Sequence, residues 1–235
     1  MGIAYNPKIV TDGLVLCLDA ANPKSYPGSG ATWFDLSGNN NNGTLVNNPS
    51  VAGGSVTFNY LNSQQVNFSS APSLQFLNRA PYTLEAWVYP TRNPDANNWT
   101  GIFDRESNLG SGRDGYNLYF LGSATTETYF SSDRWATGTL TIPSILVDSS
   151  QSVNNWNHIV VTYDGTNVAI YRNSVLGQSI ASTGNITNNV KTLNIGVRGG
   201  QFFDGNVSNA KIYSKALSIQ EIQQNFNAAR GRFGI

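Results

Sequence analysis

The sequence predicts an all-β protein built as two stacked antiparallel sheets, with one short helix near the C-terminus. Short apolar or alternating segments recur along the whole chain, turn-forming residues separate them, and one segment alone has amphipathic helical spacing. The 235 residues include 23 Gly and 30 Asn, which favour turns and tolerate a positive φ. Strands at this spacing are typical of a sandwich.

The first half of the chain contains strands separated by polar loops. Residues 14–18 form an apolar run that predicts a buried strand, and residues 30–50 read as a long polar loop around a short strand at 44–46. Apolar residues alternate over 82–89, as in a strand with one face in a core. The other strands of this half are predicted at 55–59, 64–68, 100–104, 115–121 and 126–130.

The second half begins with a hairpin whose turn has a physical cause. Residues 157–163 and 167–172 flank Asp164-Gly165-Thr166, where the glycine supplies the positive φ that a tight turn requires. Further strands are predicted at 175–180, 192–197 and 206–213.

The predicted helix starts at a capping box formed by Ser218 and Glu221. Gly231 stands where a helix would end. One apolar face is predicted to pack on a sheet, and it consists of Ile219, Ile222, Phe226 and Ala229.

The composition excludes several classes of function. Lys and Arg total 14 and Asp and Glu total 14, so no basic surplus is available to attract nucleic acid or an anionic membrane. A hydrophobic share of 40% is too high for a disordered chain. The single cysteine, Cys17, rules out an intramolecular disulfide, and its apolar neighbours predict a buried, inert thiol.

We expect one domain over residues 1–235, because no linker interrupts the pattern of strands. A chain of this length buries a sufficient core without disulfides or a bound metal. Residues 1–12 and 230–235 are predicted to be arms available for docking. The N-terminal residues lack the apolar segment of a signal peptide, and no run of about 18 apolar residues could span a bilayer.

Four segments, in this order, resemble motifs of laminin-G-like, concanavalin A-like domains. They are residues 35–44 (DLSGNNNNGT), 82–90 (YTLEAWVYP), 156–165 (WNHIVVTYDG) and 203–218 (FDGNVSNAKIYSKALS). The resemblance implies a jelly-roll sandwich. It does not define a function, because this fold carries lectins, adhesion modules and hydrolases.

Two further segments, residues 12–28 and 223–235, resemble virion structural proteins of tailed phages, especially those that infect cyanobacteria. This resemblance implies a place on the surface of a particle, as a capsid decoration or a tail or fibre component, with other virion proteins and further copies of itself as partners. A net charge of zero suits dense packing of copies, because like-charge repulsion does not accumulate.

A calcium site is one possibility for the loop that begins at Asp35. The oxygens of Asp35, Asn39 and Asn41 are the hard ligands that Ca²⁺ prefers. Related domains complete such a site with an acid on the closing strand, where this chain has Ser208 and Asn209. The alternative is that Asp35 accepts hydrogen bonds from backbone amides and stabilises turns. No cofactor is required.

A glycan site is a second possibility. Trp99 and Trp135 stand in segments that read as polar loops, where large apolar rings suggest a binding surface. Tyr116, Tyr129 and Asp133 could add a further ring face and hydrogen bonds to sugar hydroxyls. The alternative is that these rings cover the ends of the core.

Catalysis is disfavoured. Asp104 and Glu106 are the one acidic pair at i and i+2, and a solvated ion-pair cluster explains them. His158 is the only histidine, and its apolar neighbours predict a structural role. We therefore expect a non-enzymatic, lectin-like virion protein that docks onto a particle and binds host-surface glycans weakly. The alternatives are a dedicated carbohydrate-binding module and, third, a glycoside hydrolase.

Overall fold

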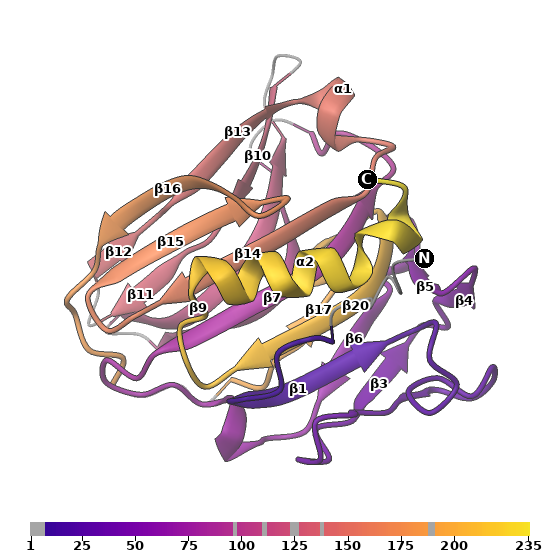
Figure 1. The fold of residues 1–235 in the computed structure, drawn as a ribbon, viewed down its shortest axis with the longest axis horizontal. Coiled ribbons are helices and arrows are strands. Elements are labelled where there is room, and N and C mark those ends of the chain that lie inside the picture. Colours follow the sequence, from indigo (N-terminus) through magenta and orange to yellow (C-terminus); the bar gives the residue numbers. More distant parts are fainter. Residues whose placement is uncertain (1–7, 96–97, 110–111, 123–126, 137–138, 188–190) are drawn as a thin grey trace, which may run out of the picture.

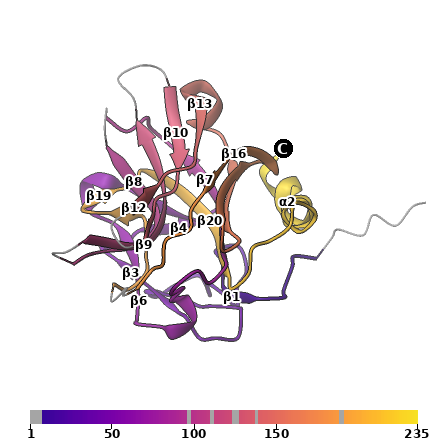
Figure 2. The same cartoon turned by 90° about the vertical axis from the view of Figure 1, so that its left-hand side faces the viewer.

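The computed structural model describes residues 8–95, 98–109, 112–122, 127–136, 139–187 and 191–235. They form two large antiparallel sheets, stacked face to face, with one long helix lying on the outer face of one sheet (Figures 1 and 2). The predicted all-β sandwich with a C-terminal helix is confirmed.

Sheet A is the sheet that the helix covers. Its central strand β7 pairs with β14 on one side and β20 on the other, and β1 extends the sheet through the second half of β20. In spatial order its strands are β16 (Val175–Ala181), β15 (Asn167–Arg172), β14 (Asn157–Tyr163), β7 (Tyr82–Pro90), β20 (Gly205–Tyr213), β5 (Ser55–Phe58) and β4 (Ser50–Ala52), with β1 (Leu14–Asp19) beside β20.

Sheet B forms the opposite side of the sandwich. Its main path runs β12 (Thr139–Thr141), β11 (Arg134–Ala136), β9 (Gly112–Gly122), β8 (Trp99–Leu109), β17 (Asn194–Ile195), β6 (Gln65–Phe68), β3 (Gly43–Val46) and β2 (Thr32–Trp33). Three further groups of elements are β10 (Glu127–Ser131) and β13 (Ser144–Asp148), the β18–β19 hairpin (Val197–Arg198 and Gln201–Phe202), and the short helices η1 (Tyr60–Asn62), η2 (Pro72–Leu74) and α1 (Ser149–Ser152).

The core lies between the two sheets and follows from alternation along the strands. Leu84, Ala86 and Val88 of β7 point inward, as predicted, and meet side chains such as Phe103 and Leu118 from sheet B. All five are fully buried. Alternation therefore turns Asp104 of β8 and Asn117 of β9 toward the outer face of sheet B, away from α2.

Helix α2 (Ile219–Phe233) begins with the predicted capping box but runs past Gly231 and ends at Gly234, whose φ is 72°. The Phe233 ring stacks on Trp87 of sheet A, with ring centroids 4.0 Å apart, and this contact offsets the low helix propensity of Gly231. No helix in the described part of the chain is long and apolar enough to cross a bilayer.

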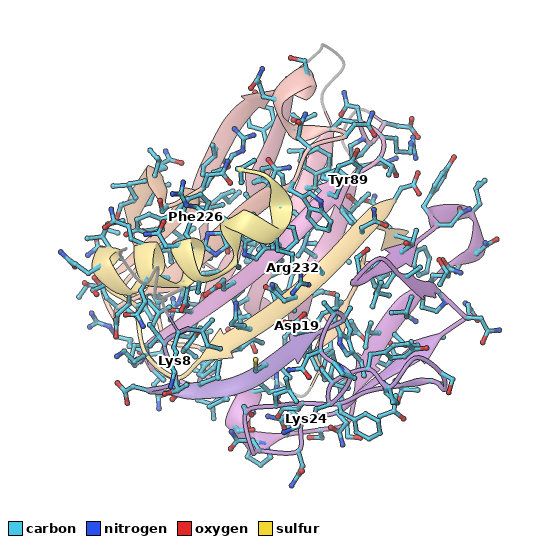
Figure 3. All side chains as sticks on the ribbon, turned by 45° about the vertical axis from the view of Figure 1, so that its right-hand side comes forward. Lys8, Asp19, Lys24, Tyr89, Phe226 and Arg232 are labelled. Carbon is cyan, nitrogen blue, oxygen red and sulfur yellow. The ribbon has the colours of Figure 1, made fainter. Side chains whose placement is uncertain are left out.

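The prediction that residues 230–235 form a free arm is wrong for the last helical turn, which packs on the chain's own sheet. Figure 3 shows Arg232 of α2 beside Asp19 of β1, and the two form an ion pair at 2.9 Å. Residues 8–12 are also docked, since buried Val10 donates its backbone N–H to Asn225 of α2 at 2.7 Å. The remainder of the N-terminal arm, residues 1–7, lies outside the described residues.

The sequence predicts no strand at the positions of β11, β12 and β13. Buried Arg134 anchors β11: its guanidinium donates to the carbonyl oxygens of Gly184 at 2.9 Å and Asn78 at 3.1 Å. It also lies 3.9 Å from the Tyr163 ring centroid. A charged residue in the interior gives no apolar pattern, so alternation could not predict this strand.

Candidate functional site

The outer face of sheet B carries a cavity of about 390 Å³. Trp99 and Trp135 stand at its rim, and the carboxylates of Asp104, Glu106 and Asp133 line its polar interior. Trp99 is 40% exposed whereas Asp104 and Asp133 are 1% and 3% exposed, so the site has open aromatic edges above a buried polar floor. This combination is typical of a ligand-binding pocket.

The acids reach the floor because of strand alternation. Phe103 points into the core, so Asp104 and Glu106 of β8 point outward together. Lys191 pairs with Asp104, and Asn117 of β9 donates to Glu106 Oε2 at 2.8 Å. The predicted ion pairs form, but they are not solvated, since Asp104 is 1% exposed and the Glu106 side chain 10%.

Arg198 joins two of the acids. Its Nη2 donates to Glu106 Oε2 at 3.1 Å and also to Asp133 Oδ2, and the Tyr119 hydroxyl donates to Asp133 Oδ1 at 2.9 Å. The guanidinium lies 4.7 Å from the Tyr119 ring centroid and 5.6 Å from that of Trp99. Charge-assisted hydrogen bonds and cation–π contacts therefore hold the floor in one arrangement.

The β18–β19 hairpin brings Arg198 to the cavity. A Cβ at Gly101 of β8 would lie 2.3 Å from the Val197 backbone, so glycine is required for the hairpin to approach β8 this closely. Gln201 from the same hairpin accepts a hydrogen bond from the Trp99 backbone N–H. Rim and floor are thus linked through one short hairpin.

Three of the five predicted glycan-site residues meet in this cavity: Trp99, Trp135 and Asp133. Trp135 lies in β11 rather than in a loop, and it faces outward because its neighbour Arg134 faces inward. The structure places the other two residues elsewhere.

Tyr116 is a correction, because it is fully buried in the core and cannot contact a ligand from the surface. Its hydroxyl donates to the Leu74 carbonyl oxygen at 2.7 Å, and burial raises its pKa. Strand alternation explains its position, because Tyr116 and Leu118 of β9 share the inward face. Tyr129 of β10 is half-buried and does not line the cavity.

Lys191, Arg198 and Gln201 also line the cavity and were not predicted; Tyr119, an aromatic candidate for sugar contact, lines it too. Tyr119 had a usable signal, since it alternates with buried neighbours in a predicted strand. Arg198 had none, because the glycine-rich segment around it indicated only a turn.

The predicted calcium ligands are engaged in hydrogen bonds within the protein. Asp35 Oδ1 accepts from the backbone N–H groups of Cys17 at 2.8 Å and Ser37 at 2.9 Å, and Oδ2 accepts from Ser37 Oγ at 2.7 Å and the Asn41 N–H at 3.0 Å. The Asn39 amide donates to Ser37 Oγ at 3.0 Å, and Ser208 Oγ donates to the Gly54 carbonyl oxygen at 2.6 Å.

These contacts match the turn-stabilising alternative for Asp35. Among the described residues, no group of three or more His, Cys, Asp or Glu side chains is placed to hold a metal ion.

A second buried charged cluster lies beneath α2, on the outer face of sheet A. Glu85 Oε1 accepts from Lys211 Nζ at 2.7 Å and from His158 Nε2 at 3.1 Å, and Oε2 accepts from Asn225 of α2 at 2.6 Å. Glu85, His158 and Asn225 are 0% exposed. Helix α2 covers Glu85, His158 and Asn225, while Lys211 lies in the wall of a second cavity, of about 380 Å³, between α2 and the outer face of sheet A. The buried carboxylate and imidazole therefore serve packing rather than ligand binding.

The protonation states of this cluster follow from its contacts. Burial alone raises the pKa of Glu85, but Lys211 and His158 outweigh burial and bring the pKa to about 2. Burial lowers the pKa of His158, whose Nδ1 has no hydrogen-bond partner among the described residues. His158 is therefore neutral, with Nε2–H donating to an ionised Glu85.

Comparison with known proteins gives a family and a fold. A profile of the concanavalin A-like lectin/glucanases superfamily matches residues 62–223. No curated protein sequence matches the chain.

Similar solved structures include the binding domain of Paraclostridial Mosquitocidal Protein 1, with 18% identity and a TM-score of 0.69. They also include the binding domain of botulinum neurotoxin DC in complex with SialylT, with 15% identity and a TM-score of 0.68. A third is from a study of botulinum neurotoxin type C, whose cell entry depends on interaction with two ganglioside molecules, with 16% identity and a TM-score of 0.67. Each alignment covers 93% of this chain and 52% of the other, so the chain spans about half the length of these structures. At this level of identity the likeness shows the fold alone.

Proposed function

The chain belongs to the concanavalin A-like lectin/glucanases superfamily, and from this premise we propose that it binds glycans, without hydrolysing them, in the cavity on the outer face of sheet B. The observation that carries the proposal is the pairing of two outward tryptophans with a fixed, buried polar floor. Sugars have apolar faces that pack on aromatic rings and hydroxyls that bond to carboxylates and amides.

Each part of the cavity has a role in this proposal. Trp99 and Trp135 provide ring surfaces for a sugar, and Glu106 and Asp133 provide acceptors for its hydroxyl groups. Arg198 holds both carboxylates in place before a ligand arrives, which lowers the ordering cost of binding. The similar structures that were studied with SialylT and with gangliosides support a binding role for the fold.

The geometry of the acids supports binding rather than hydrolysis. A glycosidase needs two carboxylates that flank the scissile bond, about 5–9.5 Å apart, with that bond between them. Here the Arg198 guanidinium contacts both Glu106 and Asp133 and occupies that position. Sugar turnover by the purified protein that is lost in Glu106→Gln would contradict this part of the proposal.

Glycan-array binding by wild type, Trp99→Ala and Trp135→Ala tests the site. We expect each variant to lose about fivefold in affinity, because an aromatic contact is worth roughly 1 kcal/mol. Trp156→Ala is the matched control, since this ring packs against Phe233 of α2 on the opposite side of the sandwich. Equal binding by all four proteins, each checked to be folded, would show that the cavity is not the site.

We further propose that the domain is displayed on a tailed-phage particle, where it docks to other virion proteins and to further copies of itself. The support is the resemblance of residues 12–28 and 223–235 to virion structural proteins, together with the zero net charge. Many weak glycan contacts would then add up through copy number.

Mass spectrometry of purified particles, followed by gold labelling with an antibody to the chain, tests this location. We expect the chain in intact particles and label on their surface. Absence of the chain from purified particles would contradict the virion proposal and leave glycan binding standing as a separate question.

A further inference from the structure

The strand register of sheet B places polar side chains in one line across six strands. Residues directly opposite each other in neighbouring strands share a face of the sheet. Following the pairs from β2 through β3, β6, β17 and β8 to β9 gives the row Thr32, Thr44, Asn67, Asn194, Asp104 and Asn117.

This row lies on the outer face of the sheet. The residues that alternate with it along the strands, among them Leu45, Val66, Ile195 and Phe103, belong to the core. Exposure falls from Thr44 onward: Thr32 is half-buried, Thr44 is exposed, Asn67 and Asn194 are half-buried, and Asp104 and Asn117 are buried. Asp104 also lines the cavity, so the row is an open polar stripe that leads into it.

The chemistry of the stripe is that of a surface for hydroxyl groups. From Thr32 to Asn194 it holds hydroxyls and amides, which both donate and accept hydrogen bonds, and it carries no charge. The carboxamide of Asn67 stands at the middle of the row, and its Oδ1 is buried with no hydrogen-bond partner among the described residues. Asp104, the one charged member, is already paired with Lys191.

The length of the stripe excludes a single sugar ring as the whole ligand. Neighbouring strands lie about 4.8 Å apart, so the five intervals from β2 to β9 span roughly 24 Å. We propose that the ligand is a linear, uncharged polysaccharide that lies across the strands of sheet B, with one unit between Trp99 and Trp135 and further units along Asn194, Asn67 and Thr44. This inference rests on the proposed function and deepens it by naming the class of glycan.

The charges along the stripe favour an uncharged polysaccharide over a polyanionic one. A polyanion such as a sulfated glycan would need cations along its path, and the four stripe residues from Thr32 to Asn194 supply none. At the cavity end, Lys191 and Arg198 are engaged by Asp104, Glu106 and Asp133. A neutral chain meets no such electrostatic cost.

An array carrying ladders of neutral linear oligosaccharides, from monosaccharide to hexasaccharide, beside sialylated and sulfated glycans tests the inference. Wild type is compared with Asn67→Ala, Asn194→Ala and the double variant. The matched control is Asn227→Ala, an exposed asparagine of α2 on the far side of the molecule. Melting temperatures confirm that each protein is folded.

We expect wild-type affinity to rise at least about tenfold from monosaccharide to tetrasaccharide, as added units gain hydrogen bonds. The stripe variants should bind monosaccharides like wild type but lose most of this rise, and Asn227→Ala should keep it. Affinity that does not depend on chain length, or a preference for sulfated or sialylated forms, would overturn the inference and leave the proposed function intact. Failure to bind any glycan would overturn both.

Discussion

The two outer faces of the sandwich both contain buried charged side chains, and they differ in what covers them. On sheet A the helix α2 closes over Glu85, Lys211 and His158, and Asn225 supplies a further hydrogen bond from the helix itself. On sheet B the corresponding cluster around Arg198 opens into a cavity with aromatic edges.

The difference shows how to separate a structural cluster from a binding site in this protein. Both clusters consist of carboxylates paired with cations, so their composition does not distinguish them. Solvent access does, because all three carboxylates of the sheet B cluster line a cavity, whereas the Glu85 carboxylate lies 0% exposed beneath α2. Substitutions on sheet A should therefore change stability, and substitutions on sheet B should change binding.

The largest effect is expected from Glu85→Ala. Removing this carboxylate leaves Lys211 buried without its ion-pair partner, which should lower the free energy of unfolding by about 4 kcal/mol. Urea denaturation measures the loss. If the alanine variant does not fold, Glu85→Gln is measured in its place. Glu106→Ala in the cavity should cost less than half as much, because its side chain is 10% exposed and water can replace it. Equal losses of unfolding free energy in Glu85→Ala and Glu106→Ala would contradict the difference between the two faces.

The pH dependence of stability should also originate on sheet A. Burial lowers the pKa of His158 from its ordinary 6.5, so the unfolded chain takes up a proton first and stability falls as the pH drops below about 6.5. The pKa of Glu85 is about 2 instead of 4.5, so its contribution is complete above 4.5 and is lost as the pH falls toward 2.

Urea midpoints across this pH range separate the two groups. His158→Gln should flatten the curve just below pH 6.5, and Glu85→Gln should flatten it between 4.5 and 2. If the curve of urea midpoint against pH is unchanged in both variants, other groups cause the pH dependence of stability.

A pair of aromatic substitutions should sharpen the contrast between the faces. Phe233→Ala removes the ring stacked on Trp87 and should lower stability by about 2 kcal/mol without changing glycan affinity. Trp135→Ala should do the reverse, with stability changed by less than about 1 kcal/mol. Thermal melts and array binding on the same protein samples measure stability and affinity. If both variants lost stability and affinity to the same extent, the two faces would not have separate roles.

The smallest effect is expected from calcium. Both oxygens of Asp35 already accept two protein hydrogen bonds each, so an ion would have to displace them. Adding Ca²⁺ or EDTA should shift the melting temperature by less than about 1 °C, since a ligand that binds only the native state must raise it. A clear rise with Ca²⁺ would restore the calcium site.

Local patterns predicted much of the fold. Alternation identified β7, the Asp164-Gly165-Thr166 turn positioned the β14–β15 hairpin, and the capping box located the start of α2. The same reasoning failed for β11, whose inward residue is a charged Arg134. It also failed at the end of α2, where a tertiary contact of Phe233 overrides Gly231.

The sequence by itself determined the all-β class, the inward face of β7 and three of the side chains that line the cavity. Only the tertiary structure decided that these side chains meet, because Arg198 and Glu106 lie 92 positions apart and become neighbours through sheet register and one hairpin. It also decided which charged cluster is open. Exposure depends on what packs over a strand, and no pattern within the strand records that.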